Sequence, residues 1–358
     1  MKTVKKIVAV TIAAVMMLSL ASCGDNSWIV KYNGREIPTG VYTYYVYNAY
    51  EMLTYYGTIN PEEKLNGQTV ADDSDADAVD SETAANEVPA EEYINNYALE
   101  QVLYLCELWD RYEAAGLSMD EATIADKNEH INDEYEQYKD LYVTNGVAKT
   151  SVEIASAQGM FGIMQDQLFN HLYGEGGTQQ VTKDELKTFF LDNHVGYSYV
   201  YESLVKDGLP LSDDEKAAVK TRLEGVKSDV EKGKKKFEDV VKEYSDAYVA
   251  DSTAGKYGAP ESVVKKNSES ELMLALLEIE AGKLGYVEID NYAFLLKRHD
   301  LNSMDYFEKN QEMLLESYKL EGFQKDIMDT AKAASYELNK NAYKQFGIRK
   351  LDIDGVTL

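Results

Sequence analysis

Hydrophobic residues recur every three or four positions along most of the chain, which is the spacing of helices that pack on one face. Four long stretches of this kind follow one another, starting near residues 89, 118, 150 and 182. Another covers residues 38–56, where Pro38 occupies the first turn. Residues 303–346 return to the same pattern, so both ends of the chain are predicted to be helical.

Several of these helices have a recognisable beginning. A hydroxyl residue stands three positions before a glutamate in Ser118–Glu121, Thr150–Glu153, Thr182–Glu185 and Ser212–Glu215. In a capping box the hydroxyl oxygen accepts a hydrogen bond from the glutamate amide, and the glutamate side chain bonds back. We therefore expect helices to start at these four places.

The middle of the chain has a different pattern. Residues 197–205 alternate as a strand does, and the helices 212–233, 237–244 and 268–279 follow. The segment 245–259 is rich in turn residues, and residues 285–289 and 293–298 are two further predicted strands. The order β-α-α-α-β-β predicts a small α+β domain. Residues 28–32 are predicted to be a strand before the tight turn Asn33-Gly34, and residues 348–353 a closing strand.

These patterns predict a division of the chain into four parts. They are residues 1–22, 23–194, 195–300 and 301–358. Within the second part, residues 66–92 carry a run of acids without a basic residue, and we predict that they form a disordered acidic loop.

Charge and cysteine content limit the possible functions. The chain has 36 Lys and Arg against 63 Asp and Glu, so its net charge is −27 and nucleic acid is excluded as a probable partner. Two cysteines exclude a disulfide framework and a multi-cysteine metal site. No phosphate- or dinucleotide-binding motif occurs, and no cofactor or metal is predicted. The four histidines, His130, His171, His194 and His299, are interpreted as structural.

The first residues predict the compartment. Lys2, Lys5 and Lys6 precede an apolar run from Ile7 to Ala21, which has the length of a signal peptide. The run ends in Leu20-Ala21-Ser22-Cys23, the pattern of a bacterial lipobox, whose cysteine sulfur receives a diacylglycerol. We therefore expect a protein held by lipid on Cys23 at the extracytoplasmic face of a bacterial membrane. The second cysteine, Cys106, lies in an apolar helix and is predicted to be a buried hydrophobic residue.

Five segments resemble the SurA/PrsA-type extracytoplasmic foldases, which carry parvulin domains. The segment that begins with Val30–Ile37 resembles the opening strand, turn and helix of that family. Four further segments of this chain resemble the parvulin motifs in their order and spacing: Phe237–Asp246, Ala254–Gly258, Leu277–Leu284 and Tyr292–Lys297. The resemblance implies a helical chaperone module, built from both flanks, with a parvulin-like domain inserted between them.

The resemblance also implies a pocket, which is altered here. The two parvulin histidines fall on Tyr199 and Phe294, and the Cys or Asp of the rim falls on Ala247. The Met and Phe shelf falls near Ser268 and Leu272. A Tyr–Phe pair cannot supply the donors and acceptors of two histidines. We therefore expect a chaperone or foldase that binds unfolded secreted polypeptides and has weak or lost peptidyl-prolyl cis-trans isomerase activity.

Three alternatives remain open from the sequence. One is an active isomerase with a substituted pocket, which would use the Tyr199 hydroxyl. The sequence does not decide whether the chain is an enzyme. The others are a non-enzymatic surface scaffold and a solute-binding lipoprotein. Seven tyrosines lie in the predicted helix 38–56: Tyr42, Tyr44, Tyr45, Tyr47, Tyr50, Tyr55 and Tyr56. They predict either a core helix whose tyrosine hydroxyl groups reach water or a surface that binds clients.

Overall fold

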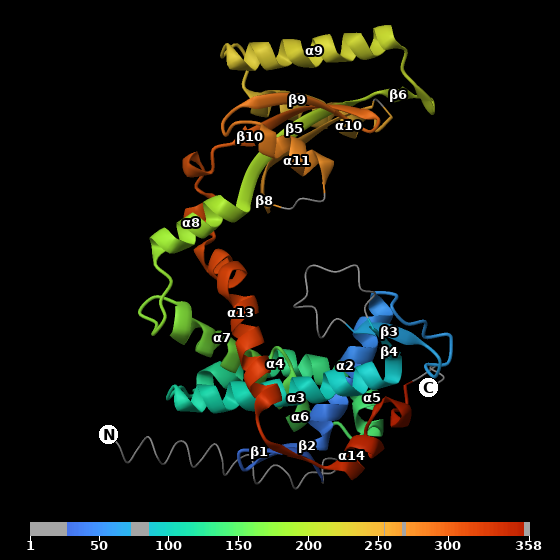
Figure 1. The fold of residues 1–358 in the computed structure, drawn as a ribbon, viewed down its shortest axis with the longest axis vertical. Coiled ribbons are helices and arrows are strands. Elements are labelled where there is room, and N and C mark those ends of the chain that lie inside the picture. The colour runs from blue at the N-terminus through green and yellow to red at the C-terminus, as the bar shows by residue number, and fades with distance from the viewer. Residues whose placement is uncertain (1–26, 73–85, 254, 267–269, 354–358) are drawn as a thin grey trace. The chain divides into compact units, whose positions relative to one another are not determined.

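The structure is a computed structural model that describes residues 27–72, 86–253, 255–266 and 270–353 (Figure 1). It has two compact units, and each is described by itself. Unit 1 contains the described residues up to Gln180 and those from Leu320 onward, and unit 2 is Val181–Lys319. Helices and small antiparallel sheets make up both units, so the chain belongs to the α+β class. In the described ranges, no helix combines the length and apolar character needed to span a bilayer.

Unit 1 consists mainly of helices. Its helices are α2 (Thr39–Tyr55), α3 (Ala90–Ala114), α4 (Glu121–Gln137), α5 (Lys139–Thr144), α6 (Lys149–Ala155), α7 (Met160–Tyr173), the part of α13 (Gln311–Ala333) from Leu320 on, and α14 (Lys340–Gln345). Its strands are β1 (Trp28–Tyr32), β2 (Arg35–Pro38), β3 (Thr69–Asp72), β4 (Asn86–Pro89) and β11 (Tyr336–Leu338), and a short 3₁₀ turn covers Ile348–Lys350.

The core of unit 1 lies between α2 and α3. Val46, Ala98 and Leu105 are fully buried, and so is Cys106, as predicted. Burial raises the pKa of the Cys106 thiol to about 12, so the thiol stays protonated at neutral pH. The core interpretation of the tyrosine-rich helix is confirmed for Tyr42, Tyr44, Tyr45 and Tyr50, which are buried.

The strand, turn and helix predicted at the start of unit 1 are confirmed. Asn33 and Gly34 have φ values of 48° and 84°, the left-handed backbone that a tight hairpin turn requires. The prediction of a closing strand was wrong: residues 348–350 form a 3₁₀ turn, and β11 pairs with β1 instead.

Residues 66–92 are not a single disordered loop. Thr69–Asp72 and Asn86–Pro89 pair as the antiparallel strands β3 and β4, and α3 begins at Ala90. Val70 lies opposite Val88 and is only 5% exposed. The acidic composition did not predict this hairpin, because its strands contain few apolar residues: Val70 is buried and Val88 is half-buried. Residues 73–85 lie outside the described residues.

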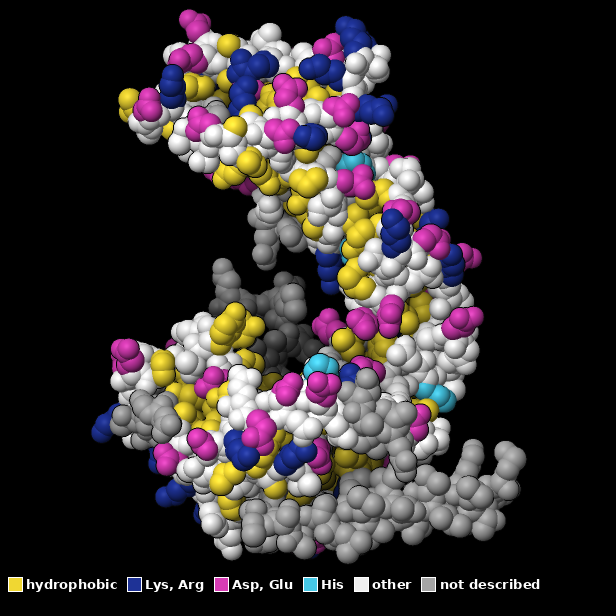
Figure 2. Space-filling view, turned by 180° about the vertical axis from the view of Figure 1, so that it is seen from behind, with side chains coloured by type: hydrophobic (Ala, Val, Ile, Leu, Met, Phe, Trp, Pro, Cys, Tyr) yellow, Lys and Arg dark blue, Asp and Glu magenta, His cyan; other side chains and the backbone are white. Residues whose placement is uncertain are grey.

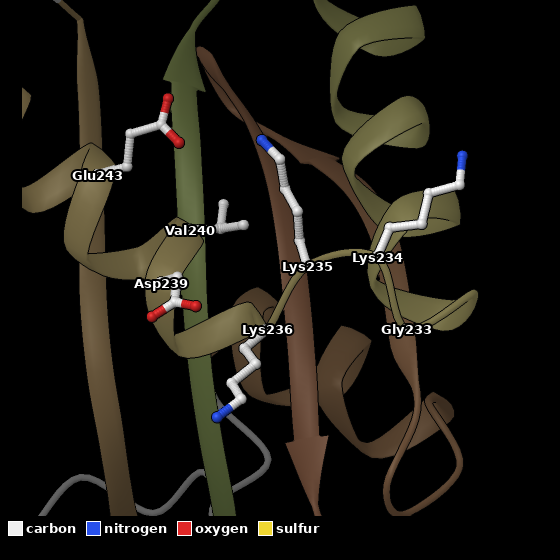
Figure 3. Close-up of a pocket in the computed structure, with 7 residues that line it drawn as sticks. All are labelled: Gly233, Lys234, Lys235, Lys236, Asp239, Val240 and Glu243. Atoms are coloured by element: carbon white, nitrogen blue, oxygen red, sulfur yellow. The ribbon is translucent and has the colours of Figure 1, made fainter.

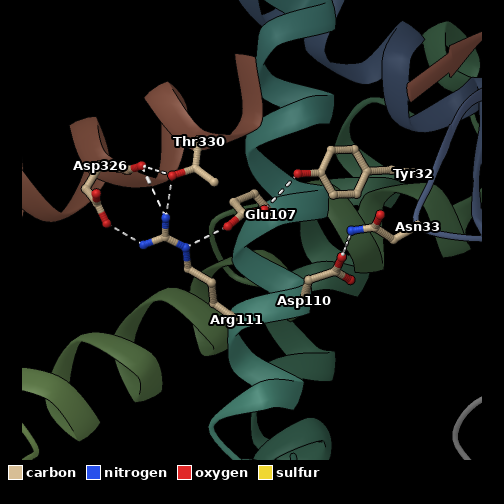
Figure 4. Close-up of polar contacts among 7 residues, drawn as sticks. All are labelled: Tyr32, Asn33, Glu107, Asp110, Arg111, Asp326 and Thr330. Atoms are coloured by element: carbon tan, nitrogen blue, oxygen red, sulfur yellow. Dashed lines mark hydrogen bonds and ion pairs between the residues drawn. The ribbon is translucent and has the colours of Figure 1, made fainter. Parts of the chain in front are cut away.

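Arg111 joins segments of unit 1 that are far apart in the sequence (Figure 4). Its guanidinium group donates to Glu107 on the same helix at 2.7 Å and to Thr330 on α13 at 2.7 Å, and pairs with Asp326. Glu107 also accepts a hydrogen bond of 2.7 Å from the hydroxyl group of Tyr32 on β1. The arginine therefore connects α3 to α13, and Glu107 connects α3 to β1.

Unit 2 contains the mixed part of the chain. Its helices are α8 (Lys183–Asn193), α9 (Asp213–Glu231), α10 (Phe237–Ala250), α11 (Glu271–Glu278), α12 (Tyr306–Lys309) and the first residues of α13, with a 3₁₀ turn at Leu301–Ser303. Its strands are β5 (His194–Ser203), β6 (Val205–Lys206), β7 (Leu209–Pro210), β8 (Lys256–Lys265), β9 (Leu284–Ile289) and β10 (Tyr292–His299).

Four of these strands form one antiparallel sheet in the order β8-β5-β10-β9. Side chains of α9 and α10, including Leu223 and Val240, pack with Val200 and Leu295 on one face. Side chains of α11, including Met273, pack with Val195 and Leu296 on the other face. The sheet is thus covered by two helices on one face and by the short α11 on the other (Figure 1).

Strand β8 adds an element that the sequence pattern did not predict. It lies within and beyond the predicted turn-rich segment, and it contains Gly258 and Pro260. Proline is tolerated there because β8 is an edge strand. Glycine is needed because a Cβ atom at position 258 would lie 2.2 Å from the carbonyl oxygen of Val241 on α10. The same residues that suggest a loop allow α10 to lie against the sheet edge.

Two of the four expected helix starts have the predicted capping box, and Thr150 lies inside α6, which has no side-chain cap. The capping boxes at Thr182 and Ser212 are confirmed. The box at Ser118 was wrong, because Asp120 caps α4 by accepting from the Thr123 amide. The helix predicted from residue 150 is two helices, α6 and α7, since the chain leaves helical geometry at Ser156 and resumes after Gly159.

Candidate functional site: the aromatic face of the four-stranded sheet

Alternation along β5 directs three tyrosines to one face of the sheet. Tyr197, Tyr199 and Tyr201 are half-buried, whereas Ser198 and the other even-numbered residues between them are buried on the opposite face. Successive tyrosine rings are stacked at centroid distances of 6.1 and 6.4 Å. β5 therefore presents a continuous row of rings.

Tyr199 and Phe294, which the resemblance aligns with the parvulin histidines, lie together on this face. In the register of β5 and β10, Phe294 is opposite Tyr201, and Leu296 is opposite Tyr199. Phe294 is therefore the diagonal neighbour of Tyr199 on the adjacent strand. The rings meet edge to face at a centroid distance of 5.6 Å. The two positions are thus joined by an aromatic contact.

Two more tyrosines extend the surface around Tyr201. Tyr257 on β8 lies 5.7 Å from the Tyr201 ring, and Tyr292 on β10 lies 4.8 Å from it. We call the set Tyr197, Tyr199, Tyr201, Tyr257, Tyr292 and Phe294 the aromatic face. Burial raises the pKa of Tyr199 and of Tyr201, so their hydroxyl groups remain neutral at physiological pH. The face offers ring surface and neutral hydroxyl groups.

A hollow of about 230 Å³ lies beside Tyr197 at one end of the aromatic face. Leu272, Met273 and Leu276 of α11 form its apolar wall, and Lys265 lies at its margin. Leu272, which the resemblance aligns with the Met and Phe shelf, is one of the residues that line the hollow, and Ser268 lies outside the described residues. Met273, one position further along, was not singled out from the sequence, although α11 has the periodicity that would have identified it.

Ala247 lies on α10, the helix whose preceding turns pack on the opposite face of the sheet. It is half-buried, and its methyl group has no donor or acceptor. The neighbouring Tyr248 contacts Tyr257 at a ring distance of 5.2 Å. This end of α10 therefore adds the ring and hydroxyl group of Tyr248 beside the aromatic face, whereas Ala247 adds no polar group.

The opposite face holds two polar clusters that sequence reasoning missed. Glu202 is 3% exposed and accepts hydrogen bonds from Arg222 on α9 at 2.9 Å and from Tyr244 on α10 at 2.7 Å. Burial alone would raise the pKa of Glu202, but the hydrogen bonds from Arg222 and Tyr244 outweigh it and lower the pKa. The carboxylate thus stays ionised and ties both covering helices to β5.

The second cluster connects three strands. Ser198 Oγ lies 2.9 Å from His299 Nε2, and His299 Nδ1 lies 3.3 Å from a carboxylate oxygen of Glu261. Serine, histidine and carboxylate in this order suggest an activated nucleophile. Ser198 is only 4% exposed, however, on a strand paired at both edges, so a substrate has no route to its hydroxyl. We interpret the cluster as a structural link between β5, β10 and β8.

Comparisons with known proteins define the class of unit 2. Residues 204–294 match the Rotamase family model, which describes the PPIC-type PPIASE domain. This match confirms the resemblance of the segment to parvulin domains. The match starts five residues after Tyr199 and ends at Phe294.

Solved structures that align with about three quarters of this chain are named PrsA. One is the foldase protein PrsA from Streptococcus pneumoniae, with 15% identity, 77% of this chain and 100% of that chain covered, and a TM-score of 0.33. Another is the peptidylprolyl isomerase PrsA from Bacillus cereus, with 15% identity, coverages of 77% and 98%, and a TM-score of 0.32. No curated protein matches this chain.

Proposed function

We propose that the chain is an extracytoplasmic foldase that holds unfolded secreted polypeptides and has weak or lost peptidyl-prolyl isomerase activity. The contact between Tyr199 and Phe294 carries the proposal. Phe294 is the last residue of the match to the PPIC-type domain, Tyr199 lies five residues before its start, and the resemblance aligns both with the two parvulin histidines. Rings there can bind apolar side chains of a client, but they offer little polar chemistry to a prolyl amide.

The barrier to rotation about a peptide bond supports weak catalysis. It is about 18–20 kcal/mol, and lowering it requires groups that stabilise the twisted amide. Phe294 has no donor or acceptor, and Ala247 adds none. The Tyr199 hydroxyl is the one polar group among these three, and its raised pKa keeps it a neutral donor. An isomerase that used this hydroxyl alone is the competing function.

Exposed aromatic side chains in unit 1 support client binding as well. Tyr55 and Tyr56, at the end of α2, are 84% and 74% exposed, unlike the buried tyrosines earlier in the helix. Their rings contact each other at 5.3 Å. Large apolar side chains left in water often mark an interaction site. Both units thus have surfaces suited to an unfolded chain.

Two activities of the chain from Gly24 onward test this function. A protease-coupled assay with an X-Pro peptide should show little acceleration, and a stoichiometric amount should slow aggregation of an unfolded protein. The variant Tyr292→Ser should weaken protection, because it removes a ring from the aromatic face. Tyr336→Ser is the control, since both tyrosines lie in strands and are 39% exposed.

Each part of the proposal has its own contrary result. Isomerase acceleration equal to that of a parvulin with both histidines would refute weak catalysis and favour the substituted active enzyme. Absence of any protection against aggregation would refute the holding function and favour a surface scaffold. Equal effects of the two tyrosine variants would remove the aromatic face from client binding.

Lipid anchoring through Cys23 is a separate part of the proposal. It is supported by the lipobox in the sequence, and Cys23 lies outside the described residues. Cys23→Ala should abolish incorporation of labelled lipid and release the protein from membranes of the producing bacterium. Unchanged labelling and retention would contradict anchoring at this residue.

A further inference from the structure

The loop between α9 and α10 has the opposite charge to the protein as a whole. Residues 232–236 read Lys-Gly-Lys-Lys-Lys in a chain with a net charge of −27. All five residues are exposed. On the face seen in Figure 2, acidic side chains are spread over the surface, with Lys and Arg side chains among them. This basic loop, Lys232–Lys236, is a local exception that the proposed function does not use.

The backbone of the basic loop has a defined conformation. Gly233 has a φ of 70° and donates to the carbonyl oxygen of Val230, and the amide of Lys234 donates to the carbonyl oxygen of Asp229. This pair of bonds is a Schellman ending for α9. Three residues later Phe237 begins α10 and is buried. The lysines are therefore held between two anchored helix ends.

Most of the positive charge on this loop is available. Lys234 pairs with Asp229 at 3.1 Å. Within the described residues, Lys232, Lys235 and Lys236 form no ion pair. A hollow of about 420 Å³ beside the loop is lined by Lys234, Lys235 and Lys236, but also by Asp239 and Glu243 of α10.

The directions of the side chains indicate what kind of anion would fit. The ammonium groups of Lys234, Lys235 and Lys236 point away from one another, and the carboxylates of Asp239 and Glu243 lie on the helix beside them (Figure 3). In this arrangement the ammonium groups do not converge on one point, and the carboxylates would repel a small anion there. Diverging point charges on an exposed loop fit a broad layer of negative groups better.

We infer that the basic loop is an electrostatic contact for an anionic lipid surface, which turns the α9–α10 end of unit 2 toward the headgroups. Each lysine near such a surface strengthens binding roughly five-fold, and the effect falls off within a Debye length. Three or four lysines give weak, salt-sensitive binding on this scale, enough to orient a domain but not to anchor it. The inference does not rest on the proposed chaperone activity.

Sedimentation with vesicles tests the inference. The chain from Gly24 onward is mixed at low salt with vesicles of phosphatidylcholine alone or with about one third phosphatidylglycerol, a mixture that supplies the surface charge. We expect binding to the anionic vesicles only, lost at high salt. Lys232→Gln, Lys234→Gln, Lys235→Gln and Lys236→Gln combined should weaken it by at least about ten-fold.

A charge-matched variant separates the loop from net charge. Lys64, Lys187, Lys340 and Lys344 are exposed, and changing these four to Gln removes the same charge elsewhere. This control should change binding less than about two-fold. An equal loss in both variants, or no loss in the loop variant, would overturn the inference. Binding of soluble polyphosphate without binding of anionic vesicles would overturn it as well, because the surface would then be a polymer site.

Discussion

The hydroxyl group of Tyr244 on α10 donates a hydrogen bond of 2.7 Å to the carboxylate of Glu202 on β5, in the interior of unit 2. The same carboxylate accepts from Arg222 on α9. The two helices that cover this face of the sheet are therefore both hydrogen-bonded to one side chain of β5.

Removing the Tyr244 hydroxyl should destabilise unit 2. A hydrogen bond to a charged group contributes about 1.5–3 kcal/mol, and Tyr244→Phe should lower the unfolding free energy by about that amount in urea. Tyr286→Phe is the control, because its hydroxyl donates at 2.6 Å to Glu288, which is exposed. Its loss should cost less than about 0.5 kcal/mol. Equal costs would mean that burial of Glu202 does not strengthen the bond.

Arg111→Met should destabilise unit 1 by about 1–3 kcal/mol, since Glu107 would lose its charged partner. The side chain of Glu107 is 12% exposed, whereas that of Asp326 is 69% exposed, so most of the effect should come from Glu107. Urea unfolding followed by circular dichroism measures it. Lys139→Met removes an exposed pair with Glu136 and should cost about 0–0.5 kcal/mol. A loss no larger than in this control would contradict the connecting role of Arg111.

Stability should fall as the pH drops below the ordinary histidine pKa of 6.5. Burial lowers the pKa of His194 and of His299 in the folded state. The unfolded chain then binds more protons than the folded one between the lowered values and 6.5, so protonation favours unfolding in that window. Each histidine contributes up to about 1.4 kcal/mol per pH unit there, and none above it.

Urea midpoints at several pH values between 7.5 and 5 measure this dependence. The variants His194→Gln and His299→Gln should each flatten the slope. Carboxylates such as Glu202, whose pKa is lowered, titrate further down and act below about pH 4.5. A slope that the two variants leave unchanged would assign the dependence to other groups.

Val70→Ala tests the β3–β4 hairpin that the acidic composition concealed. Val70 is 5% exposed, and losing two buried methyl groups should cost about 1–2.5 kcal/mol. Val143→Ala, at a valine that is 61% exposed, should cost less than about 0.5 kcal/mol. Thermal unfolding of the two variants gives the comparison. No difference between them would mean that the hairpin contributes little to unit 1.

Features with local causes could be predicted from the sequence, and features with distant causes could not. Thr182 and Glu185 cap α8 within a single turn, so their spacing was sufficient. The link between Ser198 and His299 joins residues 101 positions apart and depends on the register of β5 and β10. No local pattern contains that register.

The candidate site divides in the same way. The resemblance identified Tyr199 and Phe294 as corresponding positions, but their contact follows from strand pairing. Tyr257 was not predicted as part of the site, because its strand contains Gly258 and Pro260 and was interpreted as turns. Pro260 is tolerated because β8 is an edge strand, and Gly258 is needed because α10 lies close to it. Both features depend on the tertiary structure.

Alternate residues of β5 have different structural roles. Tyr199 and Tyr201 belong to the aromatic face, while Ser198 and Glu202 bond β5 to neighbouring strands and covering helices. Odd-numbered positions can therefore be exchanged without loosening the bonds made by even-numbered ones. A single inserted residue would do the reverse, placing tyrosines in the interior and the carboxylate in the binding surface. Redesign of this domain for new ligands should thus replace Tyr197, Tyr199 and Tyr201, and leave the buried Val195 and the length of the strand unchanged.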